Sequence, residues 1–125
     1  MSRWLVAVVA CLGVFGTDSL RAHHSAVLFD LSKTITVSGT LTHVDWRNPH
    51  VAVFVEVKDE ADRGVTWEFE TGAPSWFRGG NVGKADFEKA IGQPVRVDAV
   101  WAKDGTPYGY LYKIIFADGL TMELW

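Results

Sequence analysis

The residues of this chain best suited to chemistry are histidines that lie close together in the sequence. His23 and His24 are adjacent, and His50 follows a predicted turn at Asn48-Pro49. If an N-terminal leader is removed before His23, that residue carries a free α-amino group beside its imidazole, and the two nitrogens can chelate one ion. Nitrogen ligands bind Cu(II) strongly and also suit Zn(II). The pattern therefore predicts a copper or zinc site built from His23, His24 and His50.

Two carboxylates, Asp45 and Glu70, are predicted near the same turn. Each could be a further metal ligand or a hydrogen-bond acceptor that orients an imidazole. His43 falls where the apolar phase of its predicted strand changes, and we interpret it as a half-buried or solvent-facing side chain. A simpler interpretation stays open, in which the first two histidines form a solvated tail and His50 is a turn residue, because the sequence has no HExxH or CxxC spacing.

The tryptophans suggest a second kind of site that needs no metal. Trp67 and Trp101 fall on the apolar faces of their predicted strands, which favours packing in the core. The positions of Trp46, Trp76 and Trp125 do not decide between packing and exposure. If these rings stand exposed together, the protein is a non-enzymatic small-ligand or protein-binding module with an aromatic face.

Enzymatic chemistry is not favoured. The sequence has no G-x-S-x-G elbow, and Gly79-Gly80 lacks the strand and Lys-Ser/Thr context of a phosphate loop. Glu68 and Glu70 share a strand face, as exposed acids commonly do. We predict no catalytic residue and no cofactor apart from the copper or zinc ion.

Residues 1–22 have the features of a secretory signal peptide. Arg3 is followed by the apolar run Trp4–Phe15, and Leu20-Arg21-Ala22 offers a cleavage site that leaves His23 first. Cys11 gives a loose lipoprotein pattern, but it lies too soon after Arg3 for the usual apolar length. The expected location is the periplasm or the exterior of the cell.

Cleavage after residue 22 fixes the charge and redox properties of the remaining chain. It removes the sole cysteine, so no disulfide can form. Ten basic residues against fourteen acidic ones give a net charge of −4, and the basic residues are scattered, which argues against a nucleic-acid partner. Without a second long apolar stretch, we expect no membrane attachment after cleavage. A protein partner cannot be identified from these features.

Alternating apolar residues predict a mainly β domain over residues 34–125, preceded by an N-terminal extension at 23–33. Gly39 interrupts the first strand, as a bulge or sharp bend would. Three strands in hairpin succession, a short helical segment and two or three further strands match a five- or six-stranded OB-like barrel, with its helix between strands 3 and 4. The predicted strands cover residues 34–46, 50–57, 65–71, 95–101, 109–117 and 121–125, and the helical turns cover 73–79 and 86–91. A small sandwich or an open meander is the alternative.

Several segments resemble a family of exported bacterial proteins, domain of unknown function family 6152. They are AHHS and LFD near the leader, VDWRNPH, WEFETGAPS and a closing ADG. The histidine pair and the NPH turn place His23, His24 and His50 on the family pattern, and Asp45 and Glu70 fall on its acidic positions. Trp76-Phe77 and Asn81-Val82-Gly83 depart from it. The resemblance implies export and a shared site near the histidines, and it implies no reaction.

Overall fold

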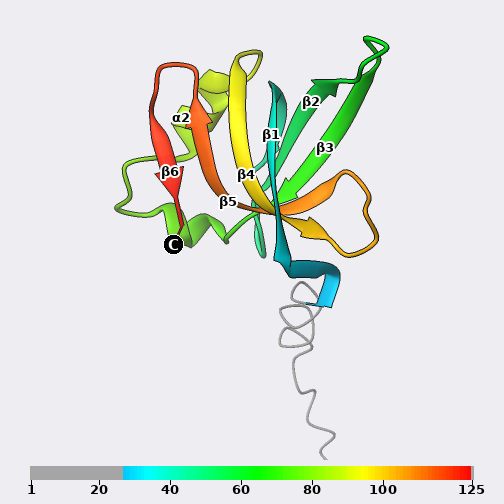
Figure 1. Cartoon of the computed structure of the whole chain (residues 1–125). Helices are drawn as coiled ribbons and strands as arrows, with labels where there is room; N and C mark the ends of the chain where they lie inside the picture. Colours follow the sequence, from blue (N-terminus) through cyan, green and yellow to red (C-terminus); the bar gives the residue numbers. More distant parts are fainter. Residues whose placement is uncertain (1–26, 125) are drawn as a thin grey trace, which may run out of the picture.

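The computed structural model describes residues 27–124, which form six strands and two short helical segments (Figure 1). No helix within this part is long and apolar enough to cross a membrane. In chain order the elements are β1 Phe29–Asp45, β2 Ala52–Lys58, β3 Gly64–Glu70, the 3-10 helix η1 Pro74–Phe77, α2 Lys84–Ala90, β4 Pro94–Ala102, β5 Tyr108–Phe116 and β6 Thr121–Glu123.

The strands form one sheet that closes on itself. Their order is β3-β2-β1-β4-β5-β6, with antiparallel neighbours, and β3 also pairs with β5 in parallel. The ring β1-β2-β3-β5-β4 leaves β6 as a short addition beyond β5. This arrangement confirms the predicted mainly β, OB-like fold, with short helical segments between the third and fourth strands.

Strand β1 is long because it pairs with two different neighbours. Residues from Phe29 to Thr40 pair with β4, and residues from Thr40 to Asp45 pair with β2. Gly39 lies at this change of partner, where a Cβ atom would collide with the backbone oxygen of Glu56 and lie 2.9 Å from Cγ1 of Val55. The β-bulge lies between Leu41 and His43, not at Gly39. Glycine is therefore needed for the close approach of the two chains.

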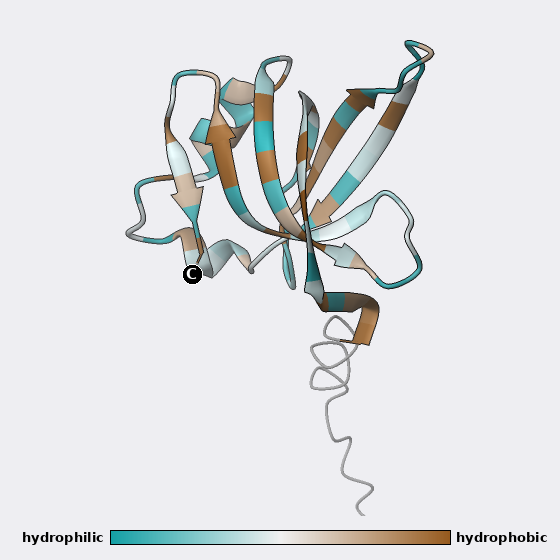
Figure 2. Cartoon of the chain, viewed as in Figure 1, coloured by the Kyte–Doolittle hydropathy of each residue, from teal (hydrophilic) through white to brown (hydrophobic). Residues whose placement is uncertain are grey.

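The core fills the inside of the ring, as the alternation predicts. Val51, Val53 and Val55 are completely buried, together with Leu41 and Phe69. A second, smaller cluster contains Phe29, Val100 and Ala102, with four partly buried aromatic residues packed against it, Trp101, Tyr108, Tyr110 and Tyr112. The apolar bands of the strands are visible in Figure 2.

The first strand begins five residues earlier than the sequence predicts. Phe29 and Asp30 pair with Ala102 and Trp101 of β4, so part of the predicted N-terminal extension belongs to the sheet. The alternation does not reveal this pairing because the register shifts between Asp30 and Thr34. The consequence is that the chain is fixed to the barrel from Phe29 onward.

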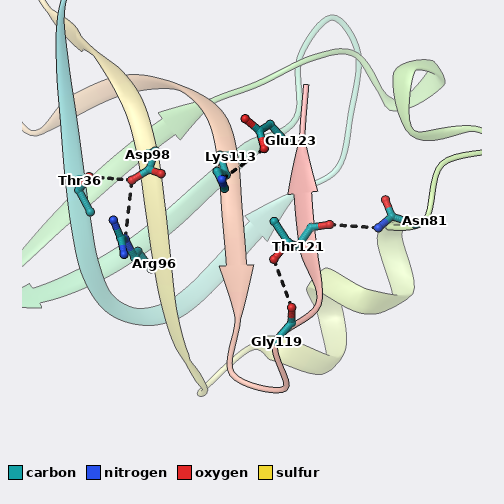
Figure 3. Close-up of polar contacts among 8 residues, drawn as sticks. All are labelled: Thr36, Asn81, Arg96, Asp98, Lys113, Gly119, Thr121 and Glu123. Carbon is teal, nitrogen blue, oxygen red and sulfur yellow. Dashed lines mark hydrogen bonds and ion pairs between the residues drawn. The ribbon is translucent and has the colours of Figure 1, made fainter. Parts of the chain in front are cut away.

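Polar cross-strand pairs cover part of the outside of β1, β4, β5 and β6 (Figure 3). The hydroxyl of Thr36 donates to Oδ1 of Asp98 at 2.7 Å, and Nζ of Lys113 lies 3.2 Å from Oε2 of Glu123. These residues are direct neighbours in the ladder, in the order Thr36, Asp98, Lys113, Glu123. Such pairs stabilise strand pairing, so no bound ligand is needed to explain this row of polar residues.

Gly39→Ala should lower the free energy of unfolding by about 2 kcal/mol or more, because the new methyl group overlaps the backbone of Glu56. Urea denaturation measures the change. Gly80→Ala is the matched control, since its Cβ would lie 3.5 Å from the nearest atom, the backbone oxygen of Phe77, and its cost should stay within about 0.5 kcal/mol. Equal stability of the Gly39 variant and the native chain would contradict the close approach.

Candidate functional site

A chain of hydrogen-bonded side chains joins His50, Glu70 and Tyr108. Nδ1 of His50 pairs with Oε1 of Glu70, and the hydroxyl of Tyr108 donates to Oε2 of the same carboxylate. The side chain of His50 is 27% exposed and that of Glu70 is 15% exposed. The carboxylate is therefore enclosed between two partners, while the imidazole keeps access to solvent.

The strand register brings these three residues together. Glu70 ends β3 opposite Ala52 of β2, and Tyr108 begins β5 opposite Glu68 of β3. Beyond the strand ends, the amide of Thr71 donates to the carbonyl of Val51 at 2.9 Å. This bond continues the β2–β3 pairing to the residue next to His50, so the imidazole is attached to ordered backbone.

Tyr108 and Tyr110 of β5 lie beside Glu70, and Phe29 packs against both tyrosine rings. Burial raises the pKa of Tyr108, and so do the hydrogen bond to Glu70 and the negative charges of Glu70 and Glu68. Burial and the charge of Glu70 also raise the pKa of Tyr110. The ring of Phe29 lies 5.2 Å from that of Tyr108 and 5.8 Å from that of Tyr110. At neutral pH both phenols are protonated, and Tyr108 acts as a donor.

The pairing with Glu70 determines which nitrogen of His50 is available. A carboxylate accepts hydrogen bonds, so Nδ1 carries the proton and the lone pair of a neutral ring is on Nε2. Within residues 27–124, the contact with Glu70 is the one side-chain hydrogen bond that His50 makes. The arrangement presents Nε2 as a possible ligand for an electrophile or a metal ion.

The other predicted site residues either make different contacts or lie outside the described range. Asp45 pairs with Arg47, with 2.8 Å between its Oδ2 and Nη2 of the guanidinium, and lies opposite Ala52 on the next strand. His23 and His24 lie outside the described residues. Within those residues no group of three or more His, Cys, Asp or Glu side chains could hold a metal ion. The structure thus brings together His50 and Glu70 of the predicted set.

His43 and the tryptophans have mainly packing contacts. The ring of His43 lies 5.5 Å from that of Phe54. Trp46 packs against Phe77 at 4.8 Å and contributes to the core. Trp76 is 61% exposed and lies against Gly72, whose Cβ would overlap the indole. Trp125 lies outside the described residues. Of the three rings considered for an aromatic face, Trp76 is exposed and Trp46 packs against the core.

Trp67 and Trp101 are partly buried against the two apolar clusters, and their rings lie 6.2 Å apart.

A cavity of about 210 Å³ lies between α2 and the turn after β5. Its two carboxylates already have structural partners, because Asp86 accepts the amide of Gly83 and Asp118 accepts the amide of Leu120, each at 2.9 Å. Lys89 also lines the cavity. None of its lining residues belongs to the His50–Glu70–Tyr108 chain, so the two features are separate.

Comparison with known proteins gives a family and no activity. The model of a family of unknown function, DUF6152, matches residues 9–111, which is most of the chain. This match confirms the resemblance seen in the sequence. No curated protein matches the chain.

Tyr108→Phe should make the protein less sensitive to alkaline pH. The raised pKa of Tyr108 means that the unfolded chain loses this phenolic proton first, so the native chain is destabilised as the pH rises above about 10. The contribution is fully present below that pH. Urea unfolding at several values between about pH 8 and pH 11 measures the slope. Loss of the hydrogen bond to Glu70 lowers stability by the same amount across this pH range, including at pH 8. Comparing how steeply the stability of each protein falls with pH therefore separates the two effects. An unchanged slope would contradict the assignment.

Proposed function

The chain belongs to DUF6152, a family of unknown function, and we propose that it is an exported protein that binds Cu(II), or Zn(II), with Nε2 of His50 as one ligand. The observation that carries the proposal is the contact between Nδ1 of His50 and the carboxylate of Glu70. Histidine ligands in metalloproteins commonly donate their other ring N–H to a carboxylate, which fixes the tautomer and makes the ligand more basic.

Tyr108 adds a further reason to regard His50 as prearranged for a ligand. Its hydroxyl holds the second oxygen of Glu70, so the carboxylate is restrained from two sides. A restrained acceptor limits rotation of the imidazole, and less rotational entropy is then lost when an ion binds. A turn histidine with a purely local role does not require a partly buried carboxylate that is itself held by a tyrosine from another strand.

His23 and His24 supply the remaining nitrogens in this proposal. Cleavage before His23 gives an amine and an imidazole on one residue, and Cu(II) binds such nitrogen sets strongly. Phe29 is held against Tyr108, whose hydroxyl reaches Glu70, and His23 precedes Phe29 by six residues. Six extended residues span up to about 20 Å. In this proposal the fixed position of Phe29 would give the histidine pair a high effective concentration near His50.

Asp45 has a subsidiary role in the proposal. Its carboxylate is already paired with Arg47, so it would join the ligand set only after that ion pair opens. Glu70 orients His50 and is not a direct ligand. The proposed physiological role is buffering or delivery of the metal outside the cytoplasm, which requires binding and release and no catalysed reaction.

Removing the imidazole of His50, or blocking the N-terminal amine, should weaken metal binding at least about tenfold. The test uses protein shown by mass spectrometry to begin at His23, titrated calorimetrically with Cu(II) and with Zn(II) against a competing chelator. It is compared with a chain that carries one extra N-terminal alanine and with His50→Ala. His43→Ala is the matched control, because His43 packs on Phe54 and should leave affinity unchanged. Equal, weak binding by all four proteins would rule out the site.

Glu70→Gln should weaken metal binding by about 10- to 100-fold, because an amide is a poorer acceptor for the Nδ1 proton of His50. Glu68→Gln is the control, since this acid lies two residues away on the same strand face. Nitrogen NMR shifts of the His50 ring report its tautomer independently of any metal. If the tautomer changes and affinity does not, Glu70 orients His50 for another purpose.

A further inference from the structure

Three aliphatic side chains form an exposed group at the start of the described chain. Val27 is 64% exposed, Leu28 is 50% exposed and Leu31 is 78% exposed. In Figure 2 the ribbon is brown, that is hydrophobic, where the described chain begins. Val65 and Ile91 are also exposed, but they lie far from this segment and from each other in the sequence. We call Val27, Leu28 and Leu31 the N-terminal patch.

The fold holds the patch in place. Phe29, between Val27 and Leu31, is buried against the tyrosines of β5, and the carbonyl of Leu28 accepts the amide of Lys103 at 2.8 Å. Oδ1 of Asp30 accepts the hydroxyl of Ser32 at 2.6 Å and its amide at 3.1 Å. These bonds lie at the register shift of β1, beside the exposed Leu31. The exposure therefore belongs to a segment fixed by backbone and side-chain contacts.

Two lysines, Lys33 and Lys103, lie near Asp30 beside the patch. Nζ of Lys33 lies 3.7 Å from Oδ2 of Asp30, and the side chain of Lys33 is 67% exposed. Hydrogen bonds from Ser32, followed by the charges of Lys33 and Lys103, hold the pKa of Asp30 below its usual range. Two lysines thus accompany one carboxylate. Aliphatic side chains flanked by lysines are typical of a surface that inserts shallowly at an anionic membrane interface.

We propose that the N-terminal patch, with Lys33 and Lys103, contacts the surface of an anionic lipid bilayer. Protein interfaces are enriched in aromatic residues and arginine and depleted in lysine, whereas these exposed side chains are aliphatic and lysine. The apolar run Trp4–Phe15 precedes Val27 by eleven intervening residues, so export of the chain brings this end toward the membrane. The contact is peripheral and requires no spanning segment. The expectation of no membrane attachment after cleavage concerned spanning segments and lipid anchors, and the proposed contact is of neither kind.

The contact is tested by flotation of protein that begins at His23 with vesicles of phosphatidylethanolamine and phosphatidylglycerol. Chelator is present throughout, so the result does not depend on the proposed metal site. We expect binding that falls with salt and is lost on neutral phosphatidylcholine vesicles. Leu28→Ser with Leu31→Ser should reduce partitioning about tenfold, since each change removes buried aliphatic groups. Lys33→Gln with Lys103→Gln should reduce it about fivefold per lysine.

Val65→Ser with Ile91→Ser is the matched control, because it removes two exposed aliphatic side chains elsewhere on the barrel. This variant should bind like the native chain. Circular dichroism confirms that each variant is folded. Absence of vesicle binding by the native protein, or equal loss in the patch and control variants, would overturn the proposal. Concentration-dependent dimerisation that the Leu28 and Leu31 changes abolish would assign the patch to a second copy instead.

Discussion

The parallel pairing of β3 with β5 is the interaction on which the rest of the structure depends. It closes the sheet into a ring, and it pairs Glu68 with Tyr108, Phe69 with Gly109 and Glu70 with Tyr110. A Cβ at Gly109 would lie 2.9 Å from the carbonyl of Val100 and 3.3 Å from Cδ1 of Phe69. Glycine at position 109 therefore leaves room both for the backbone of β4 and for the ring of Phe69 in β3. Without this contact β3 would be an open edge, prone to unintended pairing.

Ring closure also creates the polar chain at the candidate site. Tyr108 and Glu70 are separated by 37 intervening residues, and the parallel register places the phenol within hydrogen-bonding distance of the carboxylate. Glu70 then reaches across the β2–β3 pairing to His50. Because each partner comes from a different strand or strand end, the geometry of the imidazole is set by the barrel and not by its own turn.

The sequence predicted most of the fold because its strands alternate clearly. Val51, Val53 and Val55 are buried as their spacing requires, and the helical segments lie within a few residues of their predicted places. The start of β1 was missed because Leu31 to Lys33 interrupt the pairing. At the site, His50 and Glu70 were chosen for their chemistry, and the structure places them in contact. The sequence does not predict Tyr108 as a site residue because parallel pairing between distant strands leaves no periodic signal. It does not predict Phe29 because this residue precedes the register shift in β1.

Phe29 connects the two proposals physically. Its buried ring holds the chain against Tyr108 and Tyr110, so the residues before it start from a fixed point beside the carboxylate that orients His50. The same anchoring leaves Leu28 and Leu31 exposed on either side of it. A metal bound by His50 together with His23 or His24 would hold both ends of the segment that precedes Phe29, so this segment would become a closed loop. Because the fold already holds the patch at Leu28, metal binding and bilayer contact would both act on the short stretch of chain between the histidines and the patch. Coupling of this kind is reciprocal, so each ligand should alter the affinity for the other by the same factor.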